Sequence, residues 1–505
     1  MFAQVNSLGI NGINGYPVAV ECHISNGLPG FDVVGLPDTA VKEARERVRA
    51  AIKNSGFRFP TSRIILNLAP ADTKKSGTVY DLPILIGILV ATGVVTAPDR
   101  RSAFLGEISL EGKLRGVNGV LSMAIAALKA GFDTLYVPAD NAPEATLCGG
   151  LNVIPVTDIR QLADHLSGCQ IIPPQPEWKP ADNPREYLDF KDVKGQLAAK
   201  QALEIAAAGG HNVLMVGPPG SGKSMLAKRL PSIMPAMSRE EALEVTQIHS
   251  IMGMLDRNSP LVTTRPFRSP HHTVSMAGLA GGGSNPHPGE ITLAHRGLLF
   301  LDELPEFRKE TVEILRQPME DGVVTISRAS NTVTYPSDFV LVAAMNPCRC
   351  GWYGDENHKC TCSHREIIAY NNKISGPLRD RIDLTVEVLA LSYDEMSGYP
   401  ESESSAVVRA RVEEAVERQR HRFAGTGIKC NAAMQSRELR QFCQLNDASQ
   451  KVMRRAYERL RLTMRTYDKI LKVSRTVADL DGSDDIQVEH IAQAVGFRES
   501  NFEYL

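Results

Sequence analysis

One glycine-rich stretch has the residue types and the spacing needed to hold a phosphate. The segment NVLMVGPPGSGKSMLAKRL contains an apolar strand, a turn and a helix, and residues 217–224 fit the pattern G-x-x-x-x-G-K-[ST]. Glycines let backbone N–H groups close around a phosphate, and the helix N-terminus adds partial positive charge. We expect Lys223 to reach the β- and γ-phosphates of ATP and Ser224 to hold Mg²⁺. The residues expected to bind nucleotide are Gly217, Pro218, Pro219, Gly220, Ser221, Gly222, Lys223 and Ser224.

Two further apolar stretches end in polar side chains that suit hydrolysis. GLLFLDEL ends in Asp302 and Glu303, and DFVLVAAMNP ends in Asn346. Downstream of a phosphate-binding loop, such an aspartate supports Mg²⁺ and the following glutamate polarises the attacking water. Asn346 is expected to orient that water. The pattern therefore favours hydrolysis of the nucleotide over its storage.

Two arginines are candidates for stabilising charge on the γ-phosphate. We expect Arg381, in GPLRDRIDL, to act across a subunit boundary, and Arg465, in LTMRTYDKILKVSRT, to act from a helical lid. A cation brought to the γ-phosphate increases the rate of hydrolysis about 10³-fold or more. For either arginine alone a surface salt bridge is the default interpretation, and their order along the chain favours the catalytic one.

These motifs, in this order, resemble an AAA+ ATPase of the helix-2-insert group. More narrowly, RPFRSPHHTVSMAGLAGGGSNPHPGEITLAHRGLLFLDELPEF resembles the magnesium-chelatase-like ComM/YifB family, and the likeness extends over nearly the whole chain. The resemblance implies a homo-oligomer, a hexameric ring that uses ATP to move single-stranded or branched DNA. It implies more specifically a branch-migration helicase that promotes integration of transforming or recombining DNA.

The segment between the first two motifs is polar and rich in glycine. In this AAA+ group an inserted hairpin or helix lies there and faces the pore of the ring. Arg265, Arg268, His271 and His272 suit a moving contact with a phosphate backbone, because arginines attract it whatever its sequence. The alternative is that these residues hold the insert together or bind a neighbouring subunit.

Four cysteines follow Asn346 closely in the sequence. The segment NPCRCGWYGDENHKCTC contains two C-x-C pairs, and four thiolates in two such pairs could complete a tetrahedral Zn²⁺ site. His358 and His364 are substitute ligands, and free thiols in a reduced loop are the alternative. The cysteines are Cys348, Cys350, Cys360 and Cys362.

The pattern predicts an α/β protein with a helical C-terminal lid. Strands are expected at 18–25, 63–70, 133–139 and 151–156, and helices at 39–56 and 121–131. The expected domains are 1–170, an S5/Lon-like α/β domain; 171–186, a proline-rich linker; 187–391, a P-loop AAA+ core with insert 245–296 and cysteine-rich loop 348–362; and 392–505, the helical lid.

The first domain resembles the Lon-type fold in GEISLEGKLRGVNGVLSMAIAALKAG, but without its Ser–Lys dyad. Leu121 stands where the resemblance places the lysine base, and Ser76 is out of phase with the serine position. A leucine cannot accept a proton from a hydroxyl, so we expect this domain not to be a protease.

Composition limits the classes of protein that this chain can belong to. A net charge of −2 excludes a globally basic nucleic-acid binder, although residues 401–475 hold 17 lysines and arginines against 9 aspartates and glutamates. No apolar run reaches the roughly 20 residues of a membrane helix, and nine cysteines without a signal peptide favour a cytoplasmic protein. A magnesium chelatase subunit and a protein-remodelling chaperone remain alternatives to a DNA motor.

Overall fold

A computed structural model describes residues 1–179, 188–256, 258–283, 286–328, 331–355, 358–390 and 402–498. The chain divides into two compact units: Met1–Asp182 with Arg239–Val262, and Asn183–Ser238 with Thr263–Leu505. The end of the predicted linker and the start of the predicted lid lie outside the described residues. The chain is a mixed α/β protein with parallel strands and a helical C-terminal region, as predicted.

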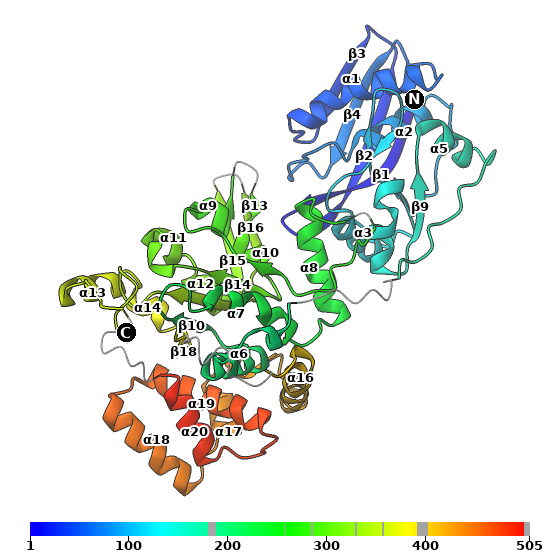
Figure 1. Ribbon diagram of the computed structural model, residues 1–505. Coiled ribbons are helices and arrows are strands. Elements are labelled where there is room, and N and C mark those ends of the chain that lie inside the picture. The colour runs from blue at the N-terminus through cyan, green and yellow to red at the C-terminus, as the bar shows by residue number, and fades with distance from the viewer. Residues whose placement is uncertain are drawn as a thin grey trace. The chain divides into compact units, whose positions relative to one another are not determined.

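The first unit is built on one seven-stranded sheet with the order β3-β4-β2-β1-β5-β8-β9. Figure 1 labels β1, β2, β3, β4 and β9 of this sheet. β1 pairs antiparallel with β2 and β2 with β4, whereas the other neighbours are parallel. The strands are β1 (Phe2–Asn11), β2 (Asn14–Ser25), β3 (Gly30–Val34), β4 (Arg63–Ala69), β5 (Ser102–Phe104), β8 (Thr134–Pro138) and β9 (Asn152–Val156). The strands and helices predicted here are confirmed.

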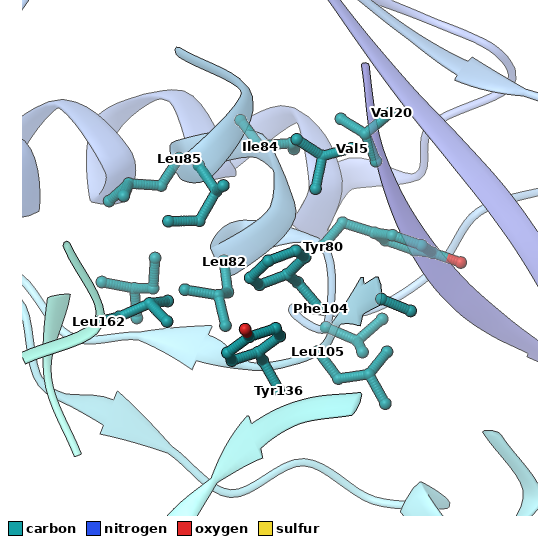
Figure 2. Packing of buried hydrophobic residues seen from close by; sticks show 14 of the residues in the cluster. Val5, Val20, Tyr80, Leu82, Ile84, Leu85, Phe104, Leu105, Tyr136 and Leu162 are labelled. Carbon is teal, nitrogen blue, oxygen red and sulfur yellow. The ribbon is translucent and has the colours of Figure 1, made fainter. Parts of the chain in front are cut away.

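Helices and a small hairpin complete this unit. They are α1 (Thr39–Asn54), α2 (Asp81–Ala91), α3 (Val120–Lys129), α4 (Ala142–Ala145), α5 (Ile159–Leu166), α8 (Arg239–Ile251), β6 (Glu107–Ile108) and β7 (Leu114–Arg115). The sequence DLPILIGILVA makes α2 apolar on every side, so this helix lies wholly inside the core. Figure 2 shows Leu82, Ile84 and Leu85 packed there near Phe104 and Tyr136, whose rings stack at 4.5 Å.

The second half of helix α8 belongs to the predicted insert 245–296, and the whole helix lies within the first unit. Ser250 near its end donates a hydrogen bond to the carboxylate of Glu144. The same carboxylate accepts from the backbone N–H of Leu121 at 2.8 Å and from Asn141 Nδ2 at 3.3 Å. Burial raises the pKa of Glu144, and these three donors oppose that rise. Long-range polar contacts thus assign the first part of the insert to this unit.

The second unit contains a five-stranded parallel sheet with the order β11-β14-β17-β10-β18. These strands are β10 (Val213–Val216), β11 (Phe267–Arg268), β14 (Leu298–Leu301), β17 (Val340–Met345) and β18 (Leu384–Glu387). β10, β14 and β17 are buried at every position, as expected for parallel strands covered on both faces. Two hairpins accompany the sheet: β12 (Gly281–Gly282) with β13 (His287–Pro288), and β15 (Val323–Arg328) with β16 (Asn331–Pro336).

Helices surround this sheet and form the C-terminal region. Around the sheet lie α6 (Leu197–Gly209), α7 (Lys223–Arg229), α9 (Met276–Ala280), α10 (Glu290–Leu293), α11 (Lys309–Glu313), α12 (Arg316–Asp321), α13 (His364–Asn371) and α14 (Gly376–Arg379). The C-terminal helices are α16 (Ser405–Arg422), α17 (Ser436–Phe442), α18 (Asp447–Leu460), α19 (Met464–Leu480) and α20 (Val488–Gly496). One apolar cluster runs from the sheet into these helices. Across the described part of the chain, the helices are all too short or too polar to span a bilayer.

Candidate active site

The carboxyl ends of neighbouring parallel strands bring the predicted motifs together. β10 leads into the phosphate-binding loop, β14 ends just before Asp302, and β17 ends just before Asn346. β17 lies between the other two strands in the sheet. Because parallel strands end on the same edge, residues as far apart in sequence as Lys223 and Asn346, 123 positions, meet at one place.

The phosphate-binding loop folds around the lysine of its own motif. Gly220 and Gly222 have positive φ angles of 78° and 93°, which side chains with a Cβ rarely adopt. Lys223 Nζ donates to the carbonyls of Gly217 at 2.7 Å and Pro218 at 2.8 Å. Burial lowers the pKa of Lys223 to about 8, against the opposing effect of the Asp302 and Glu303 carboxylates. A buried ammonium held this way fits a ligand that carries several negative charges.

The two residues predicted to hold Mg²⁺ lie in direct contact. Ser224 Oγ donates to Asp302 Oδ2 at 2.6 Å, and Asp302 Oδ1 accepts from the backbone N–H of Glu303 at 3.0 Å. A hydroxyl beside a carboxylate is the oxygen donor set that Mg²⁺ prefers. Glu303 itself adopts a left-handed conformation with a φ of 53°, which is uncommon outside glycine. Strain of this kind gathers at functional sites.

Asn346, which directly follows β17, contacts Lys223 of the phosphate-binding loop. Its Oδ1 accepts from Lys223 Nζ at 3.3 Å, and its backbone N–H donates to the hydroxyl of the buried Tyr370. The structure therefore brings Lys223, Ser224, Asp302, Glu303 and Asn346 to one edge of the sheet. Their catalytic roles stay predictions.

A histidine of the insert lies beside Glu303, which the sequence did not indicate. His272 Nδ1 is 3.6 Å from Glu303 Oε2, and the rings of His271 and His272 lie 4.1 Å apart. Strand β11 pairs with β14 in register Arg268↔Leu299, so the chain after each strand leaves the sheet at the same edge. The histidine pair thus lies next to Glu303, the predicted catalytic base.

The two arginines of the same segment are engaged within the fold. Arg265 donates from Nε to the carbonyl of Pro235 and from NH1 to that of Arg296, both at 2.7 Å. Arg268 forms a two-pronged ion pair with Glu290 at 2.6 and 2.8 Å, which raises the pKa of Arg268. These bonds match the alternative that the residues hold the insert together. DNA contact by Arg265, Arg268, His271 or His272 stays a prediction.

The two candidate γ-phosphate arginines lie on other elements. Arg381 follows α14 and binds the Glu320 carboxylate and the carbonyl of Pro377. Arg465 is the second residue of α19, and its side chain is 71% exposed and lies 3.8 Å from Asp380. An ion pair between exposed side chains is weak, so this cation can approach another anion at little cost. Their action on a γ-phosphate stays a prediction.

The four predicted cysteines form one cluster. Their Sγ atoms lie within 4.8 Å of one another, and among the described residues no histidine belongs to this group. His358 instead stacks on Trp352 at 3.9 Å and contacts Asp355. The cluster of Cys348, Cys350, Cys360 and Cys362 could hold a metal ion.

The first unit shows why serine protease chemistry is not expected. Leu121 is fully buried in its core, whereas Ser76 is exposed. An apolar side chain cannot serve as the base for serine attack.

Comparison with known proteins assigns the family. A profile described as "Magnesium chelatase, subunit ChlI" matches residues 189–396, one for the C-terminal part of that subunit matches 402–498, and "Subunit ChlI of Mg-chelatase" matches 20–141. The chain is 42% identical to a Salmonella typhimurium protein named YifB, over 98% of this chain and 97% of YifB. It is 43% identical to "Competence protein ComM" of Haemophilus influenzae, over 98% and 97%. The chain belongs to the magnesium-chelatase-like YifB/ComM family. It is also 26% identical to the "Magnesium-chelatase 38 kDa subunit" of Cereibacter sphaeroides, over 32% of this chain and 54% of that subunit.

Membership of the YifB/ComM family and the geometry of the site agree. The parallel sheet, the phosphate-binding loop and the helical region are those of an AAA+-type ATPase. Such proteins use ATP and Mg²⁺, and the buried Lys223 and the Ser224–Asp302 pair fit both.

Proposed function

We propose that this chain is an ATP-hydrolysing motor that moves DNA, a branch-migration helicase that works as a hexameric ring on single-stranded or branched DNA. The observation that carries the proposal is the placement of Lys223, Ser224, Asp302, Glu303 and Asn346 along one sheet edge. Lysine, magnesium ligands, base and sensor are the parts that phosphoryl transfer to water needs.

Each of these side chains has one task at the site. Lys223 holds the phosphates, and Ser224 with Asp302 holds the Mg²⁺, which neutralises charge on the phosphate oxygens when it is bound. Glu303 accepts a proton from the attacking water, and Asn346 orients that water. Asn346 Oδ1 already accepts a hydrogen bond from Lys223 Nζ at 3.3 Å, which puts Asn346 within reach of a phosphate that the lysine binds.

Support for DNA as the substrate comes from a relative and from local charge. The similar protein ComM carries the name of a competence protein. Along α18 and the turn after it, Lys451, Arg454, Arg455, Arg459 and Arg461 are exposed. A basic row of this kind attracts a phosphate backbone independently of sequence. The chain is nearly neutral overall, with a net charge of −2, so this charge is local.

A ring assembly gives the remaining arginines a role. Arg381 acts across the subunit boundary on the neighbouring nucleotide, and Arg465 acts from the helical region on its own. Within one chain, Arg381 is paired with the Glu320 carboxylate and Arg465 lies beside that of Asp380. Glu320 is 64% exposed and Arg381 17% exposed, so Arg381 must leave a partly buried pair to reach a neighbouring nucleotide.

A magnesium chelatase ATPase subunit is the second candidate. The family profiles carry that description, and chelatase subunits align with part of this chain. The alignment spans 32% of the chain, whereas the YifB and ComM alignments span nearly all of it, which favours the DNA motor.

The test compares the wild type with Glu303→Gln. We expect the variant to bind ATP with unchanged affinity and to hydrolyse it at least about 100-fold more slowly, because the base is lost. Branched DNA should accelerate hydrolysis by the wild type, with a salt-sensitive dependence on DNA concentration. Normal turnover by Glu303→Gln would refute the assignment of the base. An ATPase that neither binds DNA nor responds to it would favour the chelatase or a protein-remodelling chaperone.

A further inference from the structure

The cysteine cluster has the dimensions of a tetrahedral metal site. The Sγ atoms of Cys348 and Cys350 are 3.3 Å apart, those of Cys350 and Cys360 3.5 Å, and those of Cys348 and Cys360 3.7 Å. Sulfur atoms around Zn²⁺ at about 2.3 Å are separated by about 3.8 Å at the edges of a tetrahedron. A disulfide would need about 2.05 Å, so none of these pairs is bonded.

The backbone around the cluster is arranged to receive thiolates. Cys348 Sγ accepts hydrogen bonds from the N–H groups of Gly351 and Tyr353, and Cys350 Sγ accepts from those of Trp352 and Thr361. Such bonds favour a sulfur that carries negative charge. The turn that produces them depends on Gly351, whose φ is 90°. Four sulfur ligands gathered at these distances suit a soft divalent metal.

The same loop rests on the phosphate-binding loop. A Cβ at Gly351 would lie 2.6 Å from Pro219 Cδ, so the two loops touch at this glycine. The backbone N–H of Gly217 donates to the carbonyl of Met345 at 3.2 Å. Cys348 comes two residues after Asn346, whose side chain contacts Lys223. The metal loop, the sensor and the phosphate-binding loop thus form one connected set of contacts.

We propose that Cys348, Cys350, Cys360 and Cys362 bind one Zn²⁺, and that this ion fixes the loop after β17 against the phosphate-binding loop. Zinc has no redox chemistry, and a site closed by four protein ligands is structural. The bound ion would keep Asn346 and Pro219 in position beside the nucleotide. The effect on turnover rests on the proposed ATPase activity, whereas the metal content does not.

The first experiment measures metal in the full-length chain, purified without chelators or added metal. Elemental analysis should find about one zinc per chain in the wild type and in the control Cys169→Ser, whose cysteine lies outside the cluster. Cys360→Ser/Cys362→Ser should lose the zinc, and Cys362→His should keep it because imidazole also ligates zinc. Replacement by Co²⁺ should give the absorption of a tetrahedral thiolate site. Absence of metal, iron in place of zinc, or zinc retained by the double serine variant would overturn the site.

The second experiment separates the metal from the ATPase. Lys223→Ala should keep its zinc while it loses nucleotide binding, so failure of the ATPase proposal would leave the metal result intact. The zinc-free double serine variant should hydrolyse ATP about tenfold more slowly or worse, because displaced catalytic groups cost that much. Cys362→His should restore turnover. Unchanged turnover after complete loss of zinc would overturn the proposed link between metal and nucleotide site.

Discussion

ATP binding is expected to weaken as the pH rises through about 8, because Lys223 loses its proton. In the nucleotide-free protein, burial lowers the pKa of this lysine to about 8 from its ordinary 10.5. Polyphosphate beside the ammonium favours the charged form and raises the pKa again on binding. Above pH 8 the protein must therefore take up a proton to bind ATP. The unfolded chain keeps the Lys223 proton up to about pH 10.5, whereas the nucleotide-free fold keeps it only up to about pH 8. The free energy of unfolding of the nucleotide-free protein therefore rises between these two pH values.

The size of the effect follows from the fraction of protonated lysine. With a pKa of about 8, about three quarters of the Lys223 side chains carry a proton at pH 7.5, and about a tenth at pH 9. The affinity for ATP should fall about eightfold over this interval, which is about 1.3 kcal/mol. The phosphates of ATP are fully ionised throughout, so their own titration adds little.

Calorimetric titration with a non-hydrolysable ATP analogue and Mg²⁺ tests this. In buffers of different ionisation enthalpy, about 0.2 proton should be taken up at pH 7.5 and about 0.9 at pH 9. Burial also lowers the pKa of Lys469 to about 8, yet this lysine contacts Asp383 and the carbonyl of Ile382. Lys469→Arg should therefore keep the pH dependence, and Lys223→Arg should flatten it. A flat wild-type profile, or one abolished by Lys469→Arg, would refute the argument.

Two further predictions concern packing. Gly217→Ala should impair ATP binding and lower the melting temperature, because the new Cβ would lie 2.1 Å from the carbonyl oxygen of Val388. The control for thermal melting is Gly376→Ala, because a Cβ at that position would meet nothing within 4 Å. Asp479→Ala should cost about 3–5 kcal/mol in denaturant unfolding, because it leaves the cations of Arg422 and Arg475 without their shared buried carboxylate. A loss under 1 kcal/mol from Asp479→Ala, or normal ATP affinity in Gly217→Ala, would contradict these accounts.

Local patterns predicted which polar residues would meet at one edge of the sheet, whereas their roles toward a nucleotide stay predictions. A phosphate-binding loop between an apolar strand and a helix is specified by consecutive residues, and Asp302 and Asn346 directly follow short buried strands. Parallel pairing then brings these strand ends together without further information. Cysteine spacing likewise indicated the cluster that the structure forms.

Contacts between distant residues were not predictable in the same way. The proximity of His272 to Glu303 depends on β11 pairing with β14, and the two-residue β11 has no periodicity to read. The placement of α8 in the first unit depends on contacts with residues far away in sequence, such as the bond from Ser250 to Glu144, which are 106 residues apart. Helix α2 is apolar on all sides, so its sequence shows that the helix is buried but not which side packs against the sheet.

The proposed function requires that ATP hydrolysis moves DNA. The most direct measurement incubates the purified chain with a synthetic four-way junction, Mg²⁺ and ATP, and resolves the products on a native gel. We predict conversion of the junction to duplex arms with the wild type, and none with Glu303→Gln or with a non-hydrolysable analogue. Robust ATP hydrolysis by a protein that leaves the junction intact and unbound would contradict the DNA motor.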